Sequence, residues 1–147
     1  ALLRQLTSSE VAEVYENLEI EVLNKETSPL VSPKLYSSIF KSLFLSSYLS
    51  EDDSHEILSL LTRTIFDDKI PAGIDDKSIK VSHKIGVFSR FDSDVTYFTD
   101  CGIVYVSNRP YILCVFSNKQ DEVAREQIKY VSNMVYSYVS IVRGGNN

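Results

Sequence analysis

The sequence of 147 residues has no segment dense in lysine and arginine, and its formal net charge is −5. Nucleic acids and anionic membranes need a dense cationic face on their protein partners, so neither kind of partner is expected. No apolar run approaches the ~20 residues that a bilayer requires, and no charged-then-apolar segment indicates a signal peptide. The chain opens on Ala1 without a Met. That start fits a processed or truncated protein, so the missing targeting signal does not indicate a cytosolic origin.

Signatures of bound metals and nucleotides are missing too. The sequence has no His/Cys/Asp cluster at metal-ligand spacing, no glycine-rich phosphate loop and no nucleotide motif. We therefore expect no metal and no cofactor. Internal repeats and low-complexity linkers are absent, and 44% hydrophobic content suits a single unit, 1–147, with a real core.

The sequence has only two cysteines, Cys101 and Cys114. They lie in two apolar runs, 101–106 and 111–116, that predict a hairpin. A tight loop around Asn108 and Arg109 would place Ile103 opposite Cys114. Cys101 would then be offset by two residues, a diagonal of roughly 7 Å that is too long for a relaxed disulfide. This register predicts two free, buried thiols.

Apolar spacing predicts helices first and a sheet second. Residues 8–66 form the helical segment, with helices over 8–18, 33–47 and 51–65; serine caps the first, at Ser8, and the second, at Ser32. Strands are predicted at about 78–85, 100–107 and 110–117, and the last two are apolar on both faces, so they need cover on both sides. A long amphipathic helix at 121–142 can supply one cover. The predicted fold is α+β, an antiparallel sheet with helices packed on it in an α/β sandwich.

The most informative motif is Lys84-Ile85-Gly86, at the end of the first predicted strand. It resembles the Lys-Thr/Ser-Gly element of serine β-lactamases and penicillin-binding proteins, which lies on a strand lining the acyl-transfer site. From about residue 33 to 142, the order of helix, Pro/Gly turn, Lys-x-Gly strand, hairpin and terminal helix resembles the C-terminal portion of a class A-type serine β-lactamase. The resemblance implies an incomplete β-lactamase/transpeptidase-like fold.

The resemblance also implies site roles. Lys84 would be a fixed catalytic cation that attracts the carboxylate shared by β-lactams and D-Ala-D-Ala peptides. Gly86 would let the substrate approach closely, and the N–H of Val87 would be an oxyanion-hole donor. Ile85 stands where the family has a hydroxyl that helps to bind that carboxylate, which implies an altered substrate or a lost site. His83 alternates to the opposite sheet face and would only support the strand end.

The nucleophile motif Ser-x-x-Lys has one match, residues 38–41, but about one such match is expected by chance in a chain this rich in serine. Tyr15-Glu16-Asn17 matches the second motif, yet it precedes Ser38, whereas the family places it after the nucleophile. We expect both matches to be coincidental and the true motifs to lie upstream. Glu19 and Glu21, followed by Asn24, resemble the deacylation glutamate only faintly, and His55 is expected to be solvated.

Two interpretations remain. The chain is either the C-terminal fragment of a β-lactamase-like serine hydrolase, inactive alone, or a non-catalytic homologue or α/β binding module. The first implies three partners: a β-lactam or peptidoglycan peptide in the complete protein, the N-terminal part of the same fold, and a second copy through self-association. The resemblance also implies an extracytoplasmic or membrane-anchored bacterial location.

Overall fold

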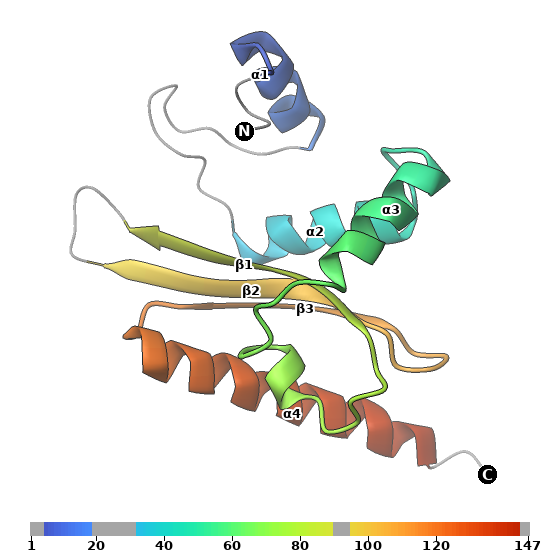
Figure 1. The fold of residues 1–147 in the computed structure, drawn as a ribbon, viewed down its shortest axis with the longest axis vertical. Helices are drawn as coiled ribbons and strands as arrows, with labels where there is room; N and C mark the ends of the chain where they lie inside the picture. The colour runs from blue at the N-terminus through green and yellow to red at the C-terminus, as the bar shows by residue number, and fades with distance from the viewer. Residues whose placement is uncertain (1–4, 19–31, 90–94, 145–147) are drawn as a thin grey trace.

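The computed structural model describes residues 5–18, 32–89 and 95–144. In the last of these ranges, side chains are described up to residue 141. Figure 1 shows the chain as helices followed by a sheet and a long terminal helix. In order, the elements are α1 (Ser8–Asn17), α2 (Pro33–Phe44), α3 (Glu51–Leu61), the short 3₁₀ helix η2 (Pro71–Gly73), β1 (Val81–Ser89), β2 (Thr96–Val104), β3 (Tyr111–Ser117) and α4 (Asp121–Gly144). The predicted α+β architecture, an antiparallel sheet of three strands with a terminal helix on one face, is confirmed.

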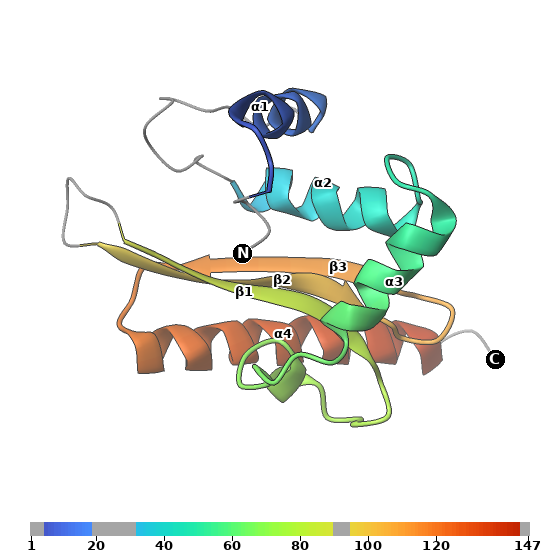
Figure 2. The ribbon, with the colours of Figure 1, turned by 45° about the horizontal axis from the view of Figure 1, so that its top comes forward.

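The sheet lies between two helical layers. Its strand order is β1-β2-β3, with both pairs antiparallel. Helix α4 and η2 cover one face, and α2 and α3 lie on the other (Figure 2). Each face has its own buried core: the α4 side contains Ile70, Ile74, Val81, Val104, Val106 and Ile128, and the α2 side contains Phe40, Leu58, Cys101 and Ile103.

Short polar residues start the first three helices. Thr7, and not the expected Ser8, caps α1: its hydroxyl accepts a bond from Glu10 N while the Glu10 carboxylate accepts one from Thr7 N, a capping box. Ser32 caps α2 as expected, ahead of a proline that needs no N–H partner. Ser50 caps α3, whose first turn carries three acids that favour the positive end of the helix dipole.

The predicted hairpin register is wrong by two residues. The strands pair Val104 with Tyr111 and Cys101 with Cys114. The connection therefore spans residues 105–110 and is not a tight two-residue loop; Arg109 N donates to Val106 O, and Asn108 takes a positive φ of 63°. Because the two cysteines are directly opposite, with Cα atoms 4.0 Å apart, they form a disulfide, and the prediction of two free thiols is wrong.

The first strand starts and ends later than predicted, and the second starts and ends earlier. Strand β1 continues past Gly86 to Ser89, and β2 begins at Thr96 and not at about residue 100. Their ladder pairs Lys84 with Cys101 and Gly86 with Thr99. The Lys-x-Gly motif thus lies in the middle of an edge strand, and the residues before and after it in β1 also pair with β2.

Candidate functional site

The Lys-x-Gly motif lies on β1, an edge strand with no second partner in the described part of the chain. Lys84 is exposed, and its ammonium donates to the carbonyl of Ile85 at 2.7 Å. Its cross-strand partner Cys101 belongs to the α2-side core, so the side chain of Lys84 emerges on that face. The strand therefore presents an exposed cation, bound to a carbonyl of its own strand, beside a backbone edge that has no partner within the described residues.

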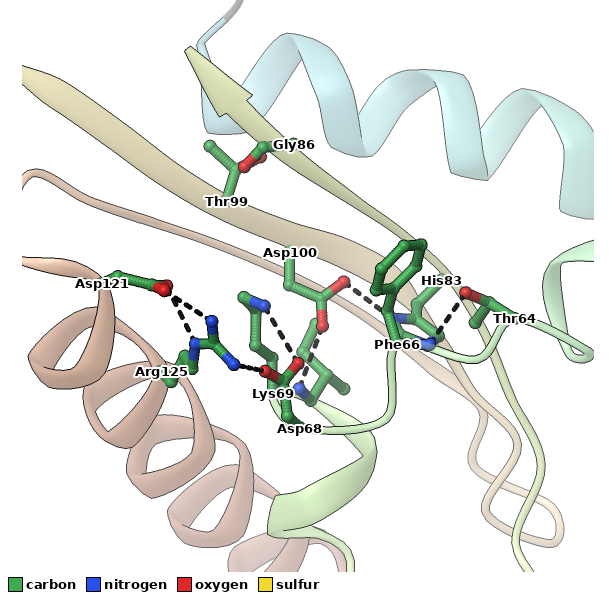
Figure 3. A network of polar contacts seen from close by, with 11 residues as sticks. Thr64, Phe66, Asp68, Lys69, His83, Gly86, Thr99, Asp100, Asp121 and Arg125 are labelled. Carbon is green, nitrogen blue, oxygen red and sulfur yellow. Dashed lines mark hydrogen bonds and ion pairs between the residues drawn. The ribbon is translucent and has the colours of Figure 1, made fainter. Parts of the chain in front are cut away.

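The next two residues leave the strand accessible. Gly86 is half-buried, and a Cβ built on it would lie 2.7 Å from Thr99 Oγ1. That hydroxyl donates to Gly86 O at 3.3 Å, so Thr99 closes one side of the glycine (Figure 3). The side chain of Val87 is 62% exposed. Sequence reasoning missed Thr99, because only the strand register brings it opposite Gly86.

A buried acid-base pair lies directly behind the motif. His83 Nδ1 and Asp100 Oδ1 are 2.8 Å apart, and Figure 3 shows the two side chains pointing at each other. The second carboxylate oxygen accepts a bond from Ile70 N at 3.0 Å. The sequence predicted His83 as a support for the strand end but indicated no partner for it. Asp100 lies 17 residues later and shares no motif with His83.

A second charged cluster fastens α4 to the segment before η2. Arg125 binds Asp121 within its own helix and Asp68 across the layer, and Lys69 lies 3.0 Å from Asp68 (Figure 3). Burial opposes ionisation of Asp68, but the hydrogen bond and charge of Lys69 and the charge of Arg125 outweigh it and lower its pKa. The hydrogen bond from Arg125 likewise lowers the pKa of Asp121.

Within the described residues, no contact joins Lys84 to the residues that match the other two enzyme motifs. The hydroxyl of Ser38 donates to the carbonyls of Lys34 and Leu35, one turn earlier in α2, and the described contacts include none between Ser38 and Lys41. Tyr15 to Asn17 lie in α1, which has no buried residue. Glu19, Glu21 and Asn24 lie outside the described residues.

A shallow cavity of about 620 Å³ lies between α3 and the start of β1. It is lined by Phe44, His55, Leu58, Ser59, Thr62, Ser78, Lys80, Ser82 and Tyr105. His55 is exposed there. The cavity includes neither Lys84 nor Gly86, so it is separate from the motif.

Within the described ranges, no group of three metal-ligating side chains occurs. Likewise, none of the described helices is long and apolar enough to span a membrane.

The model of the Beta-lactamase enzyme family, Beta-lactamase2, matches residues 2–139. The chain belongs to this family. Among curated proteins, none matches.

Solved β-lactamase structures share the fold. The β-lactamase from Sphaerobacter thermophilus DSM 20745 superposes with a TM-score of 0.76 at 18% identity, over 95% of this chain and 56% of its own. A class A β-lactamase from Bacteroides cellulosilyticus DSM 14838 gives 0.72 at 18% identity, over 89% and 53%. PBP-A gives 0.70 at 21% identity, over 90% and 51%. This chain therefore spans about half the length of the β-lactamase-fold proteins that it matches.

Proposed function

We propose that this chain is the C-terminal portion of a β-lactamase-like serine hydrolase and supplies the Lys-x-Gly wall of its acyl-transfer site. One observation carries the proposal: in a chain of the β-lactamase family, Lys84 and Gly86 lie on an exposed edge strand, where a substrate can reach both. A variant of the structurally similar PBP-A is described as an acyl-enzyme complex with penicillin G. The same class of substrate, a β-lactam or a D-Ala-D-Ala peptide of the cell wall, is proposed here.

Each residue of the wall has a chemical task in this proposal. The ammonium of Lys84 attracts the substrate carboxylate and stabilises negative charge that develops near the serine. Its present acceptor, the carbonyl of Ile85, is a neutral group on its own strand, and a carboxylate is a stronger acceptor for an ammonium. Gly86 admits the substrate backbone, and the N–H of Val87 donates to the developing oxyanion.

The nucleophile is proposed to lie in the part of the fold that this chain does not span. Acyl transfer requires a nucleophile with a base within hydrogen-bond reach. Ser38 is the serine that matches the Ser-x-x-Lys motif, with Lys41 three residues later. Its hydroxyl donates to backbone carbonyls of its own helix. That geometry supports a chain that is inactive alone.

The outer edge of β3 favours the remaining part of the same fold as the partner of this chain. In the described part of the chain, β3 pairs only with β2, which leaves its outer edge free. The buried side chains of α4 recur at residues 124, 128 and 132. A separate stripe of exposed apolar side chains runs along the same helix: Val123, Tyr130, Met134, Tyr138 and Ile141.

This stripe lies on the flank of α4 away from η2, because Asn133 and Arg125, which contact the η2 segment, emerge from the other flank. A free strand edge and an apolar flank both recruit polypeptide. The partner we propose is the N-terminal part of the fold, with self-association when that part is absent. An extracytoplasmic or membrane-anchored bacterial location is proposed from family membership.

One residue favours a second candidate, a non-catalytic homologue or binding module. Ile85 cannot donate the hydrogen bond that a Thr or Ser at this position would offer to a substrate carboxylate. Its cross-strand partner is the buried Asp100.

Covalent labelling tests the proposal. The chain alone should neither hydrolyse a chromogenic cephalosporin nor be labelled by a fluorescent penicillin, whereas the complete protein should be labelled on a serine outside residues 1–147. Labelling of this chain at Ser38, abolished by Ser38→Ala, would place the nucleophile in α2. A complete protein that takes no label with any β-lactam would favour the non-catalytic candidate.

A further inference from the structure

The buried pair of His83 and Asp100 adjoins the Lys-x-Gly motif: His83 directly precedes Lys84 in the sequence, and Asp100 is the cross-strand partner of Ile85. The relative exposure of the two residues is 1% and 0%, and their polar atoms lie 2.8 Å apart. Gly102 has no side chain to collide with His83: a Cβ built on it would lie 2.5 Å from His83 Cβ. Glycine at this position therefore lets β1 lie close to β2 at His83.

The pair belongs to a chain of buried hydrogen bonds that crosses a whole layer of the molecule. From His83 on β1 it passes to Asp100 on β2, then to Ile70 N at 3.0 Å in the segment before η2. The carbonyl of Ile70 accepts a bond from the buried hydroxyl of Ser132 on α4 at 2.8 Å. This chain ties the edge strand to the most extensive helix of the fold.

Strand β1 needs such a tie because its outer side is open. Within the described residues it has one neighbouring strand, and the Lys84 ammonium donates to a carbonyl of its own strand. His83 and Asp100 point to the η2 face, whereas Lys84 emerges on the α2 face. The pair therefore cannot touch a ligand held by the Lys84 side chain, and it acts on that residue only through the backbone.

Stability alone does not account for a pair of this kind. Well-packed apolar residues in place of a buried ion pair are often neutral or stabilising, whereas loss of one partner leaves an uncompensated buried polar group. Buried polar pairs instead specify one arrangement of the groups that they join.

We infer that His83 and Asp100 are positioning residues, which hold the backbone of residues 84–86 at a fixed place above the η2 segment. The inference rests on the proposed function only in so far as Lys84 acts on a substrate. The positional effect itself is a property of this chain.

Amide hydrogen exchange measured by NMR on this chain tests the positional effect. In Asp100→Ala, exchange at Lys84 and Gly86, whose N–H groups point at β2, should accelerate about tenfold more than exchange at Leu113 and Val115 of β3, because opening becomes local to the edge strand. Asp100→Asn, which keeps the shape and can both accept and donate, should restore most of the protection.

The matched control is Ser132→Ala, which breaks the same hydrogen-bond chain at its α4 end. It should accelerate exchange in β1 and β3 alike. Equal acceleration in both strands for Asp100→Ala would overturn the inference. If Asp100→Ala does not fold, His83→Gln replaces it with the same expectation, selective acceleration at Lys84 and Gly86.

A second measurement uses the complete protein with a fluorescent penicillin. At saturating penicillin, Asp100→Ala should lower the acylation rate constant by about tenfold or more, since misplacement by about 1 Å costs up to about 10²-fold in such steps, while Ser132→Ala should leave it unchanged. A native complete protein that takes no label refutes the proposed function, and the exchange data still decide the positioning role.

Discussion

Gly102→Ala is the most direct perturbation of the contact between β1 and β2. A Cβ at this position would lie 2.4 Å from Ser82 O, 2.5 Å from His83 Cβ and 2.8 Å from His83 Cα. Two of these atoms are backbone, so they cannot move away by a change of rotamer, and β1 must shift as a whole. Overpacking of this kind costs about 1–3 kcal/mol. The alanine recovers about 0.4–1 kcal/mol by restricting the unfolded chain.

Because the obstacle is backbone, we place the steric cost near the upper end of its range. The free energy of unfolding should then fall by about 2 kcal/mol. The assay is urea unfolding followed by far-UV circular dichroism, with m-values compared so that only stability differs.

Gly86→Ala on the facing strand is the control. The nearest atom to its added Cβ is Thr99 Oγ1 at 2.7 Å, the end of a side chain that can rotate. Its unfolding free energy should therefore change by less than about 1 kcal/mol. The packing argument is refuted if Gly102→Ala unfolds within about 0.5 kcal/mol of the native chain, or if Gly86→Ala is the more damaged variant.

Three further predictions concern the site and its support. In the complete protein, Lys84→Ala should slow acylation by a fluorescent penicillin about 10²-fold or more, as loss of an electrostatic group in such a site does, and unchanged kinetics would favour the non-catalytic candidate. Cys114→Ser opens a covalent loop of sequence separation 13 between Cys101 and Cys114, which should cost about 3 kcal/mol of unfolding free energy; detection of two free thiols in the native chain by mass spectrometry after alkylation would contradict the disulfide. Because the hydrogen bond from Arg125 lowers the pKa of Asp121, this pair stabilises the fold above the ordinary carboxyl pKa and the contribution is lost as the pH falls through the folded value. Arg125→Ala should therefore lower the urea midpoint at pH 6 and not at pH 2, and an equal loss at both values would show that packing, and not charge, is at work.

The helical half of the fold was open to prediction because its signals are local. Serine caps, a proline at the first position of α2 and acids in the first turn of α3 act within four residues of each other. The same holds for the change from helical to alternating spacing near residue 78. The start of α1 was misjudged by one residue, since Thr7 and Ser8 are both good caps and only the bond to Glu10 decides between them.

The hairpin register was not predictable in the same way. A shift of two residues leaves every side chain on its own face of the sheet, so alternation cannot distinguish the predicted register from the observed one. The six residues of the connection, 105–110, contain a turn closed from Arg109 N to Val106 O, which no short hairpin rule anticipated. The disulfide between Cys101 and Cys114 follows from that register alone.

By itself, the sequence determined the order of elements, the family resemblance and the placement of Lys84 and Ile85 on the first strand, whereas the structure extended that strand through Gly86 and Val87. These depend on neighbouring residues and on motif spacing. Only the tertiary structure decided which side chains face one another across strands: Thr99 beside Gly86, Asp100 beside His83, and Cys101 beside Cys114. The physical reason is that cross-strand partners are set by ladder register and by packing between layers, and neither is encoded within a few residues of the side chains that they bring together.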